Sequence, residues 1–253
     1  MTITAVRWLL RIMIIGFFLF SFNHSMPPFS RHPIPILVYH LLGTYPGHGE
    51  KALYVSPKNF EAQMNYLKQH GFTPLTFEDW GKASLVKKPI FITFDDGYKD
   101  NTKMWAIFNK VKSNEFEPKA TIFVISGDIG KHNHLNQTDI QSMAKSPFFS
   151  IQSHTVTHPN LARSKDLDYE LGKSKQVIQN LTGKPVVAIA YPYGLFNAKV
   201  IRKASHYYNY GLTTLPGFYH KLWIPDENYL LPRIYVKYTT TINQFAHLVT
   251  PGS

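Results

Sequence analysis

Cysteine is absent from the 253-residue chain. Its absence excludes disulfides, thiolate nucleophiles and thiolate metal ligands, but it does not decide the compartment. Long basic runs are also missing, since no run of lysine or arginine exceeds two residues. Without such runs, and without a helix-turn-helix, zinc-finger or base-stacking signature, the net charge of +11 does not predict nucleic acid binding. The charge indicates either a solvated basic surface or affinity for an anionic envelope polymer or membrane surface.

The apolar run near the N-terminus is short for a membrane span. The apolar run at residues 12–22 has eleven residues, whereas a spanning helix needs about 20. It follows two arginines and precedes polar residues, which is typical of an export signal. We therefore expect residues 1–30 to be a cleaved signal peptide or an uncleaved membrane anchor, and residues 31–253 to form one domain. That domain is expected to be secreted or anchored on the outer face of the cytoplasmic membrane, associated with the cell surface.

Short apolar runs recur along the rest of the chain and predict β-strands. They are PILVYH (35–40), PIFITF (89–94), ATIFVIS (120–126), FFSIQS (148–153), VVAIAYP (186–192), YGLTT (210–214) and LPRIYV (231–236). Amphipathic segments separate them, and strands that alternate with helices favour a parallel sheet. The predicted fold is α/β, a distorted or incomplete (β/α) barrel of about seven strands. In such barrels the site forms just beyond the carboxyl ends of the strands.

Capping residues predict the helix boundaries between these runs. Ser56 and Asn197 are expected to begin helices, because their side chains can accept the first free backbone N–H groups. Gly183 is expected to end one. Thr76 and Asp79 have the spacing of a capping box, which predicts a further helix start.

Two adjacent aspartates end the predicted strand at 89–94. Uncompensated charges at the rim of a core are unfavourable, so Asp95 and Asp96 indicate that something requires them there. Gly97 permits a sharp exit from the strand. On their own, these aspartates could simply cap the helix predicted at 98–111.

His154 and His158 form the next cluster at a predicted strand end. In an extended strand they would stand ~13 Å apart, but in a helix-like turn they would lie ~6 Å apart and could share one ion. Two unrelated surface histidines would have the same spacing. Two histidines and one carboxylate are a ligand set of catalytic zinc. With Asp96 as the third ligand, Asp95 would be left as a general base beside the metal.

The expected ion is divalent, most readily Zn²⁺, although the same ligands accept Co²⁺, Ni²⁺ or Fe²⁺.

Three segments around these residues resemble the successive motifs of the polysaccharide deacetylases, carbohydrate esterase family four. They are TFDDG (93–97), SHTVTHP (153–159) and AYPYG (190–194). ILVYH (36–40) and LPRI (231–234) resemble a circularly permuted branch, in which a catalytic histidine motif precedes the Asp-Asp motif. Within that branch the chain is most similar to the intercellular adhesion poly-β-1,6-N-acetylglucosamine deacetylases of Gram-positive bacteria.

The resemblance implies a role for each of these residues. Asp95 would be the base, while Asp96, His154 and His158 would hold the metal. His40 would be the acid that protonates the leaving amine, although a histidine that ends an apolar strand is equally often a core residue.

The third motif contributes two further expectations. The backbone N–H of Tyr193 would help the metal to hold the oxyanion. Many relatives carry an arginine in this motif that orients the base, but residues 190–192 here are Ala-Tyr-Pro. We therefore predict that Arg233 supplies the cation and pairs with the carboxylate of Asp95.

The function implied by the resemblance is removal of N-acetyl groups from poly-β-1,6-N-acetyl-D-glucosamine exopolysaccharide in biofilm formation. Chitin oligomers, peptidoglycan and acetyl-xylan are alternative substrates, and an inactive polysaccharide-binding protein is an alternative of another class. The expected partners are a polysaccharide and an anionic cell-envelope surface or membrane, but no nucleic acid, and we expect a monomer. Four aromatic residues could stack on sugar rings or pack in the core: Trp80, Tyr191, Tyr193 and Trp223.

Overall fold

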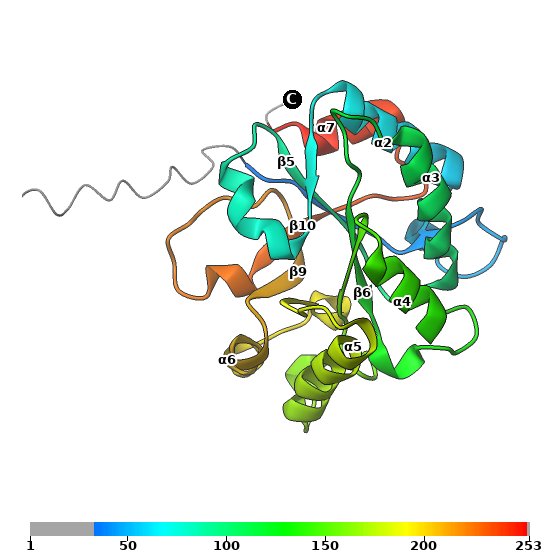
Figure 1. The fold of residues 1–253 in the computed structure, drawn as a ribbon. Helices are drawn as coiled ribbons and strands as arrows, with labels where there is room; N and C mark the ends of the chain where they lie inside the picture. Colours follow the sequence, from blue (N-terminus) through cyan, green and yellow to red (C-terminus); the bar gives the residue numbers. More distant parts are fainter. Residues whose placement is uncertain (1–32, 252–253) are drawn as a thin grey trace, which may run out of the picture. The chain divides into compact units, whose positions relative to one another are not determined.

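Seven parallel strands close into a barrel in the computed structural model, which describes residues 33–251 (Figure 1). Around the barrel the order is β1, β10, β9, β8, β7, β6 and β5, and β5 pairs with β1 to close it. The strands are β1 (Ile36–Tyr39), β5 (Pro89–Phe94), β6 (Ala120–Val124), β7 (Phe149–Ser153), β8 (Ala188–Ala190), β9 (Tyr210–Pro216) and β10 (Leu231–Tyr235). All seven coincide with predicted runs, so the predicted barrel is confirmed.

The barrel is distorted beside β5. A short strand that the sequence did not predict, β4 (Thr73–Leu75), pairs with the first half of β5, and β6 pairs with β5 only at Thr93 and Phe94. A separate two-stranded parallel sheet joins β2 (Leu41–Leu42) to β3 (Tyr54–Val55). Runs of two or three residues are too short for an alternating pattern to reveal them.

Helices cover the outside of the barrel (Figure 1). The α-helices are α2 (Pro57–Gln69), α3 (Met104–Val111), α4 (Gln137–Lys145), α5 (Ser174–Thr182), α6 (Ala198–Tyr207) and α7 (Ile242–Val249). The 3-10 segments are η1 (Lys51–Leu53), η2 (Phe77–Ser84), η3 (Lys99–Lys103), η4 (Ser126–Asp128), η5 (Leu161–Arg163), η7 (Pro192–Gly194) and η8 (Glu227–Tyr229). One segment, η6 (Asp168–Lys173), is π-helical and leads directly into α5.

Three of the four capping predictions are confirmed. The side chains of Ser56 and Asn197 accept N–H groups in the first turns of α2 and α6, and Gly183 ends α5 with a left-handed φ of 66°. The capping box at Thr76 is wrong, because its side chain makes no cap bond. In the 3-10 geometry of η2, the N–H of Asp79 donates to the Thr76 carbonyl at 2.9 Å instead, and so it is not available to the hydroxyl.

The amino-terminal part of the barrel interior is filled by an apolar cluster. It includes the first residues of β1, β8 and β10, which are Ile36, Ala188 and Leu231. Phe77 and Trp80 of η2 pack against this cluster. A second, larger cluster lies mainly between the strands and the surrounding helices. The two apolar clusters fill the amino-terminal part of the barrel interior and the space between strands and helices. The predicted site residues lie toward the carboxyl ends of the strands.

The predicted signal or anchor at residues 1–30 lies outside the described residues. Within residues 33–251, no helix combines the length and the apolar character needed to cross a membrane. All the described elements belong to one compact unit.

Candidate metal and catalytic centre

The carboxyl ends of β5 and β7 bring the predicted metal ligands together. Asp95 and Asp96 directly follow β5, and His154 directly follows β7. The chain leaves β5 in a sharp turn, with φ of 70° at Asp96 and 72° at Gly97. Gly97 is required both by this backbone and by space, since a Cβ there would lie 2.9 Å from a methyl carbon of Val124. The turn therefore holds Asp96 at the rim of the barrel.

Asp96, His154 and His158 form a group that can hold a metal ion. One ligand atom from each lies within 4.8 Å of the others. Nε2 of His154 and Nε2 of His158 are 3.2 Å apart, and they lie 3.5 Å and 3.6 Å from Oδ1 of Asp96. Two imidazoles and a carboxylate suit Zn²⁺ and other divalent transition metals. The predicted convergence of these three side chains is present in the structure.

The surroundings of His154 leave its Nε2 available for a metal. Its Nδ1 lies 2.8 Å from the carbonyl oxygen of Ala190 in β8, and a carbonyl can only accept, so Nδ1 carries the proton. Its backbone N–H donates to the carbonyl of Val124 at 2.9 Å. A hydrogen bond from Nδ1 fixes the tautomer and the ring orientation, as it does for metal-binding histidines in general.

His158 is brought to His154 by an irregular turn. The expectation of a helix-like turn is wrong, because Thr155 and His158 are both left-handed, with φ of 69° and 57°. The hydroxyl of Thr155 accepts the N–H of His158 at 3.0 Å. Burial, together with the charge of His154, lowers the pKa of His158. A lowered pKa favours the neutral imidazole that a metal requires.

Arg233 pairs with Asp95, as predicted. Its Nη1 and Nη2 donate to Oδ1 and Oδ2 of Asp95, each at 2.8 Å, and both side chains are almost fully buried. The Nε of Arg233 donates to the Thr213 carbonyl at 2.9 Å, and Nη1 also donates to the Thr93 hydroxyl at 3.2 Å. This two-pronged geometry fixes the plane of the carboxylate.

Opposing effects set the pKa of Asp95. Burial raises it, but the charges of Arg233 and His154 and the hydrogen bonds from Arg233 outweigh burial, so the pKa lies well below its usual value. Asp95 is therefore ionised at neutral pH, and its carboxylate has a fixed orientation beside Asp96.

His40 lies on the same rim, directly after β1. Its carbonyl accepts the side-chain amide of Asn101 at 2.9 Å, and its ring contacts Tyr235 at 5.5 Å between centroids. Within residues 33–251, its buried Nδ1 has no hydrogen-bond partner. Burial is the largest influence on the pKa of His40 and lowers it, although Asp95 and Asp96 act in the opposite direction.

Tyr193 contacts the metal group from η7. Its ring meets the ring of His158 edge-on, with 4.6 Å between centroids, and its backbone is left-handed at φ 59°. Tyr193 is 63% exposed and Trp223 is 71% exposed, so both residues are accessible to a sugar ring. Trp80 and Tyr191 are buried in apolar clusters, so for these two the core interpretation is correct.

Two residues that the sequence did not predict also act on this group. Burial together with the charge of the Asp96 carboxylate raises the pKa of Tyr98. Glu170 hydrogen-bonds the turn that carries His158. Neither residue belongs to a recognisable motif, and Glu170 lies on a different element. Tyr98 follows the Asp-Asp-Gly sequence directly, but nothing in the sequence pattern sets this tyrosine apart from others.

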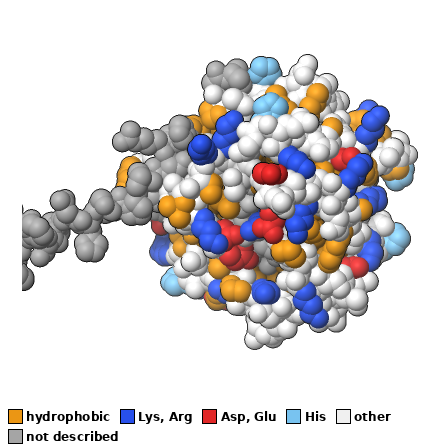
Figure 2. Space-filling model, turned by 45° about the horizontal axis from the view of Figure 1, so that its top comes forward, with side chains coloured by type: hydrophobic (Ala, Val, Ile, Leu, Met, Phe, Trp, Pro, Cys, Tyr) orange, Lys and Arg blue, Asp and Glu red, His pale blue; other side chains and the backbone are white. Residues whose placement is uncertain are grey.

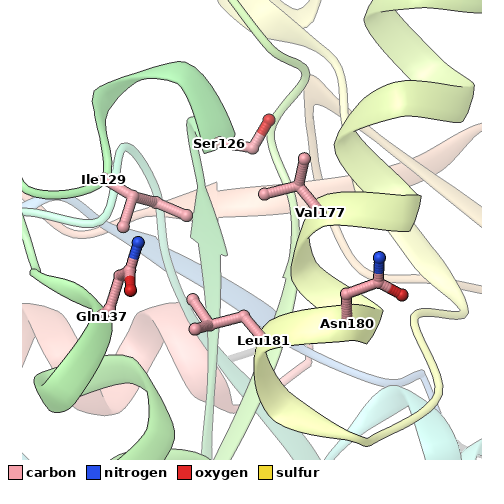
Figure 3. A pocket seen from close by; sticks show the side chains of 6 residues that line it. All are labelled: Ser126, Ile129, Gln137, Val177, Asn180 and Leu181. Carbon is pink, nitrogen blue, oxygen red and sulfur yellow. The ribbon is translucent and has the colours of Figure 1, made fainter.

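Two cavities lie near these elements. One of about 610 Å³ includes Tyr54, Tyr98 and Asp100 in its wall, so it borders the tyrosine whose pKa Asp96 raises. Another of about 410 Å³ lies between η4, α4 and α5 (Figure 3). Its labelled side chains are Ser126, Ile129, Gln137, Val177, Asn180 and Leu181. None of these six is ionisable, so the second cavity offers no acid, base or charged ligand for catalysis.

The basic charge is dispersed on the face that Figure 2 shows. There, lysine and arginine side chains alternate with acidic and apolar ones and do not gather into one patch. Dispersed basic side chains of this kind are typical of a solvated surface.

A β/α barrel with an Asp-His-His group and a second, arginine-paired aspartate at its carboxyl rim has the architecture of a metal-dependent hydrolase. The Polysaccharide deacetylase family model matches residues 82–212, just over half of the chain. The chain therefore belongs to the polysaccharide deacetylase family, and the resemblance inferred from its motifs is confirmed. His40 and Arg233 lie outside the matched range.

Relatives and solved structures agree with this assignment. The chain is 34% identical over 196 residues to a Bacillus subtilis protein named as a polysaccharide deacetylase, covering 73% of this chain and 65% of that protein. It is 28% identical over 218 residues to a Staphylococcus aureus poly-β-1,6-N-acetyl-D-glucosamine N-deacetylase, covering 77% and 70%. A Bacillus anthracis polysaccharide deacetylase structure superposes with a TM-score of 0.85 at 42% identity, covering 87% of this chain and 69% of that one. The chain thus spans about two thirds of these proteins.

Proposed function

We propose that this protein is a metal-dependent polysaccharide N-deacetylase. The observation that carries the proposal is the position of the arginine-paired Asp95 directly beside the Asp96, His154 and His158 group. Asp96 belongs to the group of candidate metal ligands, whereas the buried guanidinium of Arg233 keeps Asp95 ionised. A metal site with an adjacent carboxylate base has the groups that hydrolysis of an amide requires.

In the proposed reaction, Asp96, His154 and His158 would hold the metal, which would supply a Lewis acid for the attacking water and the acetamide carbonyl. Asp95 accepts a proton from the attacking water, and Arg233 keeps its carboxylate in one orientation. The backbone N–H of Tyr193 donates to the oxyanion of the tetrahedral intermediate. His40, in its protonated form, gives a proton to the amide nitrogen as the C–N bond breaks. The products are acetate and a free amine on the sugar.

The proposed substrate is poly-β-1,6-N-acetyl-D-glucosamine, and the proposed role is in biofilm formation. The support is the likeness to the Staphylococcus aureus enzyme of that name, at 28% identity. The deacetylated product carries cationic amines, which a protein of net charge +11 would tend to release. Chitin oligomers, peptidoglycan and acetyl-xylan are the alternatives within the same reaction class.

The proposed metal is Zn²⁺, and the proposed location is outside the cytoplasmic membrane. The location rests on the export-like pattern at residues 7–22 and on an extracellular polymer as substrate. An anionic envelope surface is the proposed partner besides the polysaccharide, and the proposed state is a monomer. Protease shaving of intact cells should degrade the domain, whereas protection until lysis would contradict the location.

An inactive polysaccharide-binding protein is the alternative of another class. The intact set of Asp95, Asp96, His154 and His158 argues against it, because a binding protein has no use for an activated water.

The test is acetate release from four substrates measured side by side: poly-β-1,6-N-acetylglucosamine, chitin oligomers, peptidoglycan and acetyl-xylan. Metal-loaded protein should release acetate fastest from the first, and chelator-treated protein should release none until Zn²⁺ is returned. Faster release from another polymer would change the substrate. Binding without release from any of them would favour the inactive binding protein.

A further inference from the structure

The turn from His154 to His158 depends on partners outside itself. Its two left-handed residues, Thr155 and His158, occupy a backbone region that is unfavourable for non-glycine residues. Such a conformation persists only where surrounding contacts hold it. The source of those contacts therefore decides where the ring of His158 lies.

Backbone N–H and hydroxyl groups of neighbouring segments hold one side of this turn. The carbonyl of Thr155 accepts the N–H of Ser126 at 3.0 Å and the hydroxyl of Ser174 at 3.0 Å. The carbonyl of Val156 accepts the N–H of Gly127 at 2.9 Å. These bonds hold the carbonyl side of the turn, but they leave the N–H groups of Val156 and Thr157 to be satisfied.

Glu170 satisfies both of those N–H groups. Its Oε2 accepts the N–H of Val156 and the N–H of Thr157, each at 2.9 Å, and its Oε1 accepts the hydroxyl of Thr157 at 2.6 Å. The side chain is buried, with 6% of the residue exposed. One carboxylate thus takes three donors from the two residues that precede His158.

Glu170 is itself held on an unusual element. It lies on the π-helical segment η6, where the adjacent carbonyl of Leu171 accepts the hydroxyl of Tyr208 at 2.6 Å. Single π-helical turns are frequent at functional sites. His154, by contrast, is fixed separately by Ala190 and Val124. Loss of Glu170 should therefore displace His158 more than His154.

We propose that Glu170 is a positioning residue for the metal site, which holds His158 in place to complete the ligand set with Asp96 and His154. The inference rests on the metal site of the proposed function. Glu170 is not a ligand in this account, and it acts only through the turn at residues 155–158.

A second buried glutamate provides a matched control. Oε2 of Glu227 accepts the N–H of Leu222 at 3.1 Å and that of Trp223 at 2.7 Å, and the residue is 7% exposed. Its Oε1 pairs with Lys221. Glu227 therefore braces a loop in the same manner as Glu170, but in a loop that carries none of the proposed metal ligands.

The experiment measures Zn²⁺ affinity by competition with a chromophoric chelator, on purified full-length protein. Glu170→Met removes all acceptors at nearly constant length and should weaken Zn²⁺ binding at least about tenfold, the usual effect of losing an outer-shell partner. Glu227→Met should lower Tm about as much as Glu170→Met does, but it should leave Zn²⁺ affinity at the wild-type value. Glu170→Gln should largely restore binding, because an amide oxygen can accept both N–H groups and the amide NH₂ can donate to the Thr157 hydroxyl.

Unchanged Zn²⁺ affinity in Glu170→Met would overturn the proposal, as would an equal loss in Glu227→Met. If Glu170→Met does not fold, Thr157→Val decides, since it removes one donor at an exposed position and should weaken Zn²⁺ binding a few-fold; no change there would overturn the proposal too. A wild-type protein that binds no Zn²⁺ would contradict both proposals. One that binds Zn²⁺ but deacetylates nothing would contradict only the proposed function.

Discussion

The two ends of the barrel interior differ in chemistry although the same strands build both. At the amino-terminal end, Phe91, Leu231 and their neighbours form an apolar cluster that Phe77 and Trp80 pack against. Toward the carboxyl end, Arg233 and Asp95 replace apolar contacts with a buried ion pair. Taking two charges out of water is unfavourable, and an apolar pair is often as stable or more so. Apolar burial is therefore concentrated at the amino-terminal end of the barrel interior, and the proposed chemistry lies at the carboxyl end.

The largest expected effect is loss of the metal site at the polar end. His158→Ala or His154→Ala should each abolish metal binding and acetate release together, because two remaining ligands hold a metal poorly. Elemental analysis of the purified variants and an acetate assay measure both. A histidine variant that keeps a full metal complement would contradict the ligand set.

The next largest effect is a loss of stability at the apolar end of the barrel interior, with the polar end left intact. Phe91→Ala should lower the free energy of unfolding by about 3–5 kcal/mol, because it leaves a cavity among buried aromatic rings. Metal content and turnover of the folded fraction should stay near wild type. Denaturant titration gives the loss of stability, and a parallel loss of metal affinity would show that the two ends are coupled.

Arg233→Ala tests how the polar end is held. Breaking a buried pair from one side typically destabilises by about 3–5 kcal/mol. Without Arg233, burial is left to raise the pKa of Asp95, and the base must be ionised to accept a proton. The acid limb of the pH–rate profile should therefore move to higher pH while metal content is retained. Arg233→Lys keeps the charge and should shift the limb less.

An unchanged acid limb in Arg233→Ala would mean that Asp95 is not the group that limits activity at low pH. The pair should also affect stability. Because the folded pKa of Asp95 is lowered, its stabilising contribution is present at neutral pH and is lost as the pH falls toward that pKa.

The smallest expected effect is at Thr93→Val. The hydroxyl of Thr93 donates to the Leu37 carbonyl at 2.7 Å and accepts from Arg233. Its loss should cost about 1–2 kcal/mol of unfolding free energy, as for a typical buried hydrogen bond. The acid limb should move slightly in the same direction as in Arg233→Ala. A shift as large as that of Arg233→Ala would mean that Thr93 orients the base as much as the arginine does.

The sequence was most informative where one pattern governs a whole segment. Apolar runs predicted all seven barrel strands, and interruption of one run by Asp95 and Asp96 predicted the rim that carries the site. The pairing of Arg233 with Asp95 followed from a missing arginine at residues 190–192 and the expected closure of the barrel. Each of these inferences needed only local pattern and the geometry of parallel strands.

The features that were missed have different physical causes. The turn at residues 154–158 is not helix-like, because bonds from Ser126, Ser174 and Glu170 stabilise left-handed residues that local propensity disfavours. The Thr76 capping box failed because a backbone bond competed for the same N–H. Strand β4 pairs with only half of β5 and is too short to show a period.

Metal content and acetate release, measured on Asp95→Asn and Asp96→Asn in parallel, test the central claim most directly. The claim is that two adjacent aspartates at one strand end have different roles, one as base and one as ligand. It predicts that Asp95→Asn keeps its metal and releases no acetate, whereas Asp96→Asn loses both. An Asp95→Asn protein without metal, or an Asp96→Asn protein that retains it, would contradict the claim.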